Sequence, residues 1–103
     1  MKAIVVHAAK DLRVETHDMP KAGPGEVLVQ LARGGICGSA LHYYSHGGFG
    51  TIRLREPMIL GHEVSGRVAD IGAGVTGLDR GQLVAVSPSR PCYTCAYCLE
   101  GRQ

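Results

Sequence analysis

Several sequence features are scarce in this chain, and each scarcity argues against a class of protein. No stretch approaches the ~20 consecutive apolar residues that a transmembrane helix needs, so no membrane span is predicted. The net charge is only +2, and the eleven Lys and Arg residues form no basic stripe, which argues against a nucleic-acid partner. The apolar run at residues 2–7 is too short for a signal peptide and has no clear cleavage site. We therefore expect a cytoplasmic protein with no membrane or nucleic-acid partner.

Large aromatic residues are also rare, whereas glycine is abundant. The chain has no Trp and one Phe but fifteen Gly, a composition that favours β-structure with tight turns over a helical bundle. Its 103 residues suit one domain. A domain of this size buries a modest core, so a bound metal or a partner domain would help to stabilise it.

A β-branched run at residues 2–7, and alternation of apolar and polar side chains at 12–16 and 26–32, contribute to a predicted series of short strands. The predicted strands cover residues 2–7, 12–16, 26–32, 59–68 and 82–86, the fourth of them interrupted by glycines. Residues 39–45 are predicted to form one or two helical turns, residues 51–58 a charged loop, and residues 88–103 a cysteine-containing loop with a helical turn near its end. The predicted fold is mainly β, a small antiparallel barrel or sandwich with appended loops.

Three cysteines at regular spacing form the clearest local motif. Cys92, Cys95 and Cys98 are separated by two residues each, a spacing that lets successive thiolates turn toward one ion at roughly 2.3 Å. Three unrelated thiols would rarely show such regular spacing. A ferredoxin-type iron–sulfur run would need a fourth cysteine where Arg102 stands, and a thioredoxin-like pair would need a βαβ unit. The loop is therefore predicted to bind zinc, with three of the four ligands that a structural site requires.

A second candidate metal site combines Cys37 with His62. Each residue follows or borders a predicted strand, and a thiolate and an imidazole brought together would leave room for water or substrate on zinc. Glu63 could orient this site or add an oxygen ligand. On these residues alone, a buried thiol and a hydrogen-bonded histidine are the commoner arrangement, so both interpretations stay open.

The remaining motifs carry weaker signals. Residues 72–77 match G-x-G-x-x-G, but a glycine-broken turn and a strand follow where a dinucleotide site needs a helix, so no cofactor-binding residue is predicted. Tyr43 and Tyr44 are candidates for lining a pocket, although adjacent tyrosines are more often half-buried in a core. His42 and His46 are candidates for proton transfer, although exposed histidines are common. No catalytic role is expected for the other two histidines, at positions 7 and 17.

Three of these motifs together resemble a known family. The segment 35–44 (GICGSALHYY), the triplet 61–63 (GHE) and the three-cysteine loop are similar to the zinc-dependent medium-chain alcohol and polyol dehydrogenases, in the branch of L-idonate 5-dehydrogenase and sorbitol dehydrogenase. The resemblance covers essentially the whole chain. It implies that residues 1–103 form the N-terminal GroES-like domain, a partly open barrel with short helices and a cysteine-rich zinc loop at 90–103.

The resemblance also implies roles for individual residues. Cys37 and His62 would bind catalytic zinc, with Glu63 beside the metal and able to ligate it, and zinc would lower the pKa of the bound alcohol for hydride transfer. Ser39 would contact the substrate hydroxyl and start a proton relay to which His42 contributes, with Tyr43 in the substrate pocket. A separate structural zinc would be bound by the three-cysteine loop (Cys92, Cys95 and Cys98) and a fourth cysteine.

The sequence departs from the family pattern in three respects. The fourth structural cysteine would fall at position 106, and the NAD(P)-binding Rossmann domain, with a further zinc ligand, lies downstream of these residues in the family. Ala40 stands where the family usually carries an aspartate that supports the zinc-binding histidine, and losing such a partner costs about 10–100-fold in metal affinity or activity. We therefore expect both zinc sites to be incomplete, and the chain to be inactive alone.

Three hypotheses about function follow. The first is a catalytic-domain fragment of an enzyme that oxidises a secondary alcohol of a small polyol or sugar acid with NAD(P). The second is a non-enzymatic zinc-binding module. The third is a subunit completed by a separate Rossmann-domain chain. The sequence does not fix the substrate or the choice between NAD and NADP.

Overall fold

The computed structural model describes residues 1–102. Its first sheet is built on a hairpin of β1 (Lys2–Ala8) and β2 (Asp11–Thr16), whose turn holds Lys10 in the left-handed region at φ 62°. The short β6 (Met58–Ile59) pairs with the other edge of β1, which gives the antiparallel order β2-β1-β6. The valine-rich β1 is therefore the central strand, as its β-branched sequence favours.

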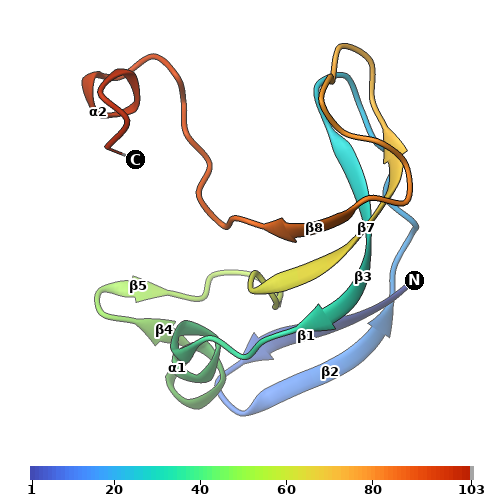
Figure 1. Cartoon of the computed structure of the whole chain (residues 1–103). Helices are drawn as coiled ribbons and strands as arrows, with labels where there is room; N and C mark the ends of the chain where they lie inside the picture. The colour runs from blue at the N-terminus through green and yellow to red at the C-terminus, as the bar shows by residue number, and fades with distance from the viewer. Residues whose placement is uncertain (103) are drawn as a thin grey trace.

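The second sheet contains β3 (Val27–Gly34), β7 (Val64–Ile71) and β8 (Leu83–Val86) in antiparallel order β3-β7-β8 (Figure 1). The central strand comes very close to β3 at Gly66. A Cβ atom on Gly66 would lie 2.1 Å from the backbone oxygen of Gln30, a distance that real Cβ contacts do not show. Glycine at this position is therefore required for the two strands to pair as closely as they do.

Two helices and a small hairpin complete the fold. Helix α1 (Gly38–His46) ends at Gly47, which adopts the left-handed conformation typical of helix C-termini. The hairpin of β4 (Gly48–Phe49) and β5 (Ile52–Arg53) follows directly beside α1. The four-residue α2 (Ala96–Leu99) stands apart from both sheets, at the end of an extended segment that follows β8 (Figure 1).

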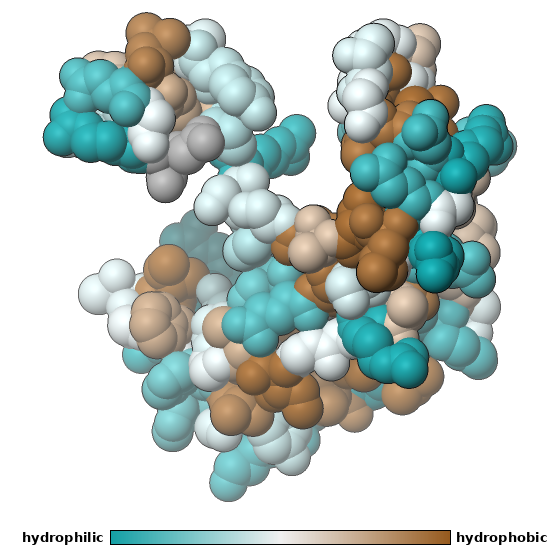
Figure 2. Space-filling model, in the orientation of Figure 1, coloured by the Kyte–Doolittle hydropathy of each residue, from teal (hydrophilic) through white to brown (hydrophobic). Residues whose placement is uncertain are grey.

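The core is small and much of the apolar surface is exposed. Only Ala3, Val5, Val6 and Val68 are buried apolar side chains within the described residues. The accessible surface is 7907 Å², whereas a compact monomer of 10.9 kDa exposes about 5,600 Å². Figure 2 shows apolar residues at the surface over the β3-β7-β8 sheet and beside β1. This openness means that the two sheets do not close around one continuous core.

The predicted architecture is confirmed, with corrections in one region. The fold is mainly β, partly open, and carries two short helices, as the sequence predicts. The single strand predicted at 59–68 is wrong: β6 ends at Ile59, Gly61 takes φ 112°, and β7 begins only at Val64. The predicted loop at 51–58 also contains β5. Neither α1 nor α2, the helices found within residues 1–102, has the length and apolar character needed to cross a bilayer.

Candidate metal centres

The first candidate centre lies where two chain segments meet beside α1. Cys37 follows β3 and caps the N-terminus of α1 with an extended backbone (φ −71°, ψ 148°). His62 and Glu63 occupy the break between β6 and β7. A hydrogen bond of 2.7 Å from the Gly35 amide to the Glu63 carbonyl holds the two segments together. The sequence predicts one strand through residues 59–68, but the chain leaves the sheet between β6 and β7. This break places His62 and Glu63 beside Cys37.

The donor set of this centre suits zinc. One ligand atom from each of Cys37, His62 and Glu63 can be chosen so that all three lie within 4.8 Å of one another. Ligands bound tetrahedrally to zinc at roughly 2.0–2.3 Å are separated by about 3.3–3.8 Å, so small side-chain adjustments would bring all three onto one ion. A Cβ atom on Gly35 would lie 2.9 Å from the Glu63 carboxylate. Glycine at position 35 therefore avoids a steric clash with the Glu63 side chain. Sulfur, nitrogen and oxygen ligands of this kind are typical of zinc sites that keep one position open.

The largest opening at this centre is a groove of about 720 Å³ lined in part by Cys37, His62 and Glu63. Two smaller cavities also border His62. The larger of these two, of about 250 Å³, is lined mainly by apolar side chains that include Ile36, Leu41, Tyr44 and Leu60. The smaller, of about 170 Å³, is lined in part by Ser39, Ala40, Tyr43 and His62. The structure therefore brings Tyr43, a predicted pocket residue, together with Ser39 and His62. It also places Tyr44, the other candidate pocket residue, in the lining of the cavity of about 250 Å³.

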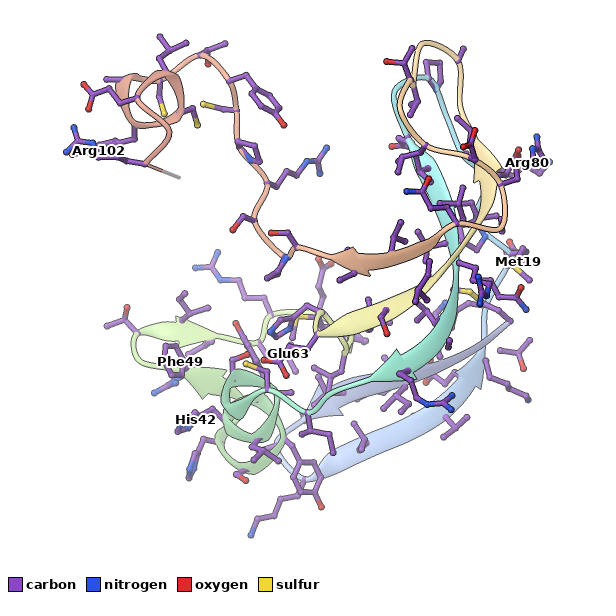
Figure 3. The ribbon with its side chains drawn as sticks, viewed as in Figure 1. Met19, His42, Phe49, Glu63, Arg80 and Arg102 are labelled. Atoms are coloured by element: carbon purple, nitrogen blue, oxygen red, sulfur yellow. The ribbon has the colours of Figure 1, made fainter. Side chains whose placement is uncertain are left out.

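The residues predicted to relay protons are only partly brought together. The hydroxyl of Ser39 donates a hydrogen bond of 3.3 Å to the Cys37 sulfur. His42 lies one turn further along α1, and its ring meets Phe49 edge-on at 5.2 Å. Figure 3 shows His42 toward the outer edge of α1 and Glu63 on the side nearer the start of β7. Within residues 1–102 no hydrogen bond joins Ser39 to His42.

The position of Ala40 leaves His62 without a carboxylate partner. Ala40 lies in the first turn of α1, where its amide donates to the Cys37 carbonyl at 3.1 Å, and its methyl group lines both cavities. No hydrogen bond to the His62 ring is found in the described part of the chain. A metal-ligating histidine is usually fixed by a hydrogen bond from its second ring nitrogen, so this imidazole lacks the usual constraint on its orientation.

The second candidate centre is the three-cysteine loop. One ligand atom from each of Cys92, Cys95 and Cys98 lies within 4.8 Å of the others, and the sulfurs of Cys92 and Cys98 are 3.6 Å apart. Two thiolates bound tetrahedrally at roughly 2.3 Å are about 3.8 Å apart, so the loop is close to the geometry of a zinc–thiolate site. Tyr93 makes the turn possible by adopting a left-handed backbone at φ 61°.

Hydrogen bonds within this loop favour the thiolate form of Cys92. Its sulfur accepts from the Thr94 hydroxyl at 3.4 Å and from the Cys95 amide at 3.3 Å. These bonds, with a further one from the Thr94 backbone, lower the pKa of Cys92 from 9.0 to about 6. The thiolate is the form that binds metal, so this sulfur is prepared as a ligand before any ion arrives. The Cys95 sulfur similarly accepts from the Cys98 amide at 3.4 Å and caps α2.

The glycine motif at residues 72–77 forms a turn, as predicted. Gly74 and Gly77 both adopt left-handed backbones, and Gly72 is paired with Glu26 through a hydrogen bond of 2.8 Å. The segment leads through further turns into β8 and opens no helix. Since a dinucleotide fingerprint places the pyrophosphate at a helix N-terminus, this turn lacks the element that the fingerprint requires.

Comparison with known proteins gives consistent matches. Residues 23–103 match the family described as the alcohol dehydrogenase GroES-like domain. Sorbitol dehydrogenase of Gallus gallus is 49% identical over 100 residues, which cover 97% of this chain and 28% of that protein. Among solved structures, L-idonate 5-dehydrogenase of Escherichia coli is 44% identical with a TM-score of 0.81, covering 98% of this chain and 28% of that one. Galactitol-1-phosphate dehydrogenase of Escherichia coli is 37% identical with a TM-score of 0.87, covering 97% and 28%.

Proposed function

Because the chain belongs to the alcohol dehydrogenase GroES-like domain family of zinc-dependent medium-chain polyol dehydrogenases, we propose that it supplies the zinc-binding, alcohol-activating part of such an enzyme. The single observation that carries the proposal is the convergence of Cys37, His62 and Glu63 beside two cavities. The chain spans 28% of the length of its curated relatives, so the activity of a whole enzyme is part of the proposal.

Cys37, His62 and Glu63 would hold the catalytic zinc. When bound there, zinc supplies Lewis acidity, which lowers the pKa of an alcohol and favours loss of a hydride to NAD(P). The position of Cys37 supports this role, because its sulfur lies with ligand atoms of His62 and Glu63 within 4.8 Å of one another. The loop formed by Cys92, Cys95 and Cys98 would hold a second, structural ion, and its separation from the sheets supports a role in stability rather than chemistry (Figure 1).

Ser39 and His42 would handle the proton of the alcohol. The Ser39 hydroxyl lies beside the Cys37 sulfur and lines the same cavity as His62, so its Oγ atom is positioned to accept a proton from a hydroxyl group entering that cavity. His42 follows three residues later on the same helix and would pass the proton to solvent after its ring turns away from Phe49. Tyr43 would contact the substrate from the cavity wall.

The proposed substrate is a small polyol or sugar acid. This follows from the relatives, which are named for sorbitol, L-idonate and galactitol 1-phosphate. The nicotinamide acceptor would be bound by other polypeptide, either in a longer chain or in a separate Rossmann-domain subunit. A reducing compartment, such as the cytoplasm, suits a protein whose four cysteines are all free.

A chimaera tests this proposal. Residues 1–103 would replace the matching residues of the Gallus gallus sorbitol dehydrogenase, and NADH formation would be measured with sorbitol and L-idonate. We expect activity that is lost with Cys37→Ser and retained with the matched control His17→Gln, which changes a side chain outside both cavities. The 103-residue chain alone should give no turnover. Full activity of the chimaera carrying Cys37→Ser would refute the proposed role of this centre.

A further inference from the structure

Helix α1 carries two histidines that lie outside the ligand sets of both candidate centres. His42 and His46 are four residues apart, so they project from the same side of the helix. Both are exposed, and their ring centroids are 5.9 Å apart with planes tilted by 33°. Neither belongs to the two groups of three or more metal-binding side chains found within residues 1–102.

The spacing of the two rings is close to that of two imidazoles on one ion. A ligating nitrogen lies roughly 2.0–2.1 Å from a divalent transition metal, which puts the centroid of its ring about 3 Å from the ion. Two rings at a tetrahedral angle on the same ion then have centroids about 5 Å apart, so the observed 5.9 Å would close by about 1 Å through rotation of the two exposed side chains. Histidines at positions i and i+4 of a helix are the arrangement that the H-E-x-x-H motif uses to bind zinc.

The helix itself does not repel a cation. The sequence of α1, GSALHYYSH, contains no Lys or Arg, although the guanidinium of Arg53 lies against Gly48 in the adjacent hairpin. His46 lies in the last turn of the helix, where the exposed carbonyl ends carry partial negative charge. The Phe49 ring meets the His42 ring edge-on, with centroids 5.2 Å apart, and leaves the His42 side chain exposed to solvent.

We propose that His42 and His46 form a two-imidazole surface site for a divalent transition metal such as Ni²⁺, Cu²⁺ or Zn²⁺, separate from the two cysteine-containing centres. Imidazole nitrogen suits these three ions, whereas it is a poor ligand for Mg²⁺ or Ca²⁺. Water would complete the coordination because both rings face solvent. Metal binding here does not depend on the proposed function, but it would occupy the imidazole that the proton relay needs.

The site can be tested on the 103-residue chain itself. The reduced chain would be loaded with zinc at the cysteine-containing centres, freed of excess zinc by gel filtration, and titrated with Ni²⁺. Imidazole resonances would be followed by NMR, since paramagnetic Ni²⁺ broadens signals near its binding site. We expect His42 and His46 to broaden together at nickel levels that leave His7 and His17 sharp.

Variants then measure how far the two rings cooperate. His42→Gln and His46→Gln should each lower nickel affinity at least about tenfold, because the second contact of a chelate forms at high effective concentration. His17→Gln, which removes an imidazole elsewhere, should leave the affinity unchanged, and amide spectra would verify that each variant is folded. The proposal is overturned if the wild-type chain shows equal broadening of all histidines, broadening confined to the cysteine-containing centres, or an affinity unaffected by His46→Gln.

Discussion

Replacing Gly66 by alanine should weaken the fold, and the structure gives the size of the effect. The added Cβ atom would lie 2.1 Å from the backbone oxygen of Gln30, 2.8 Å from its carbonyl carbon and 3.0 Å from the Leu31 Cα atom. All three are backbone atoms of β3, so no side-chain rotation can relieve the contact. The two strands must separate by about 1 Å, and overpacking of this kind costs typically about 1–3 kcal/mol.

We expect the upper end of that range, because β7 is the central strand of its sheet and pairs with both neighbours. For a domain near 100 residues, 2–3 kcal/mol lowers the unfolding temperature by about 10–20 °C. The whole free energy of unfolding of such a chain is only about 5–15 kcal/mol. Gly66→Ala should therefore be visibly destabilised in thermal unfolding followed by circular dichroism in zinc-containing buffer.

Gly38→Ala is the matched control. A Cβ atom on Gly38 meets nothing within 4 Å, and this residue begins α1 without a left-handed backbone. The same chemical change should there be neutral or stabilising by about 0.4–1 kcal/mol, since alanine narrows the unfolded ensemble. Equal unfolding temperatures for Gly66→Ala and the unchanged chain would show that β3 can move away from the added Cβ atom with no loss of stability. The argument from close packing would then fail.

Three further predictions concern the sites and the hairpin. Ala40→Asp should raise zinc retention in competition with a chelator by about 10-fold or more, because it gives His62 a carboxylate partner; unchanged retention would count against that argument. Glu15, whose pKa is lowered mainly by its hydrogen bond to His7, stabilises the fold above its ordinary value of 4.5, and this stabilisation is lost as the pH falls below it. The free energy of unfolding, measured with urea between pH 6 and pH 3, should therefore change less with pH in Glu15→Gln than in the unchanged chain. An identical change with pH in the two chains would contradict this prediction. In the metal-free, reduced chain, alkylation of Cys92 should rise with a midpoint near pH 6, and a midpoint near 9.0 by mass spectrometry would show that its hydrogen bonds do not persist.

Much of the fold could be predicted because it is specified locally. Alternating side chains identified β1, β2, β3 and β8 to within about two residues, which is the usual uncertainty of an element boundary. The strands that were missed are two residues long, too short to show a periodicity. β4 and β5 pair with each other, whereas β6 exists through pairing with a distant segment. Ile59 pairs with Val5, for example, and no local periodicity could indicate that contact.

The two candidate metal centres differ in the same respect: one is specified by local sequence, and the other depends on long-range contacts. The spacing of Cys92, Cys95 and Cys98 was sufficient to predict that their sulfurs converge, because all three lie in one short loop with two residues between successive cysteines. The meeting of Cys37 and His62 depends instead on the long-range pairing of β3 with β7, in which Gly34 lies opposite Val64, and only the family resemblance indicated it. The break at Gly61 was not predicted because strand-like residues lie on both sides of it, Ile59 and Leu60 before it and 64–68 after it, and a single glycine can stand inside a strand.

The position of the Cys37–His62 centre at the end of the β3–β7 strand pair has a mechanical consequence. Gly34 pairs with Val64, and the Gly35 amide donates to the Glu63 carbonyl. An ion held by Cys37 and His62 would therefore clamp the end of this strand pair, at the point where the chain arrives from β6 of the other sheet. At a free zinc concentration 100 times the dissociation constant, such an ion would add about 2.7 kcal/mol to stability. An ion in the loop around α2 would stiffen only that arm. The unfolding temperature of the sheets should therefore rise when zinc occupies the Cys37–His62 centre and stay unchanged when zinc occupies the three-cysteine loop.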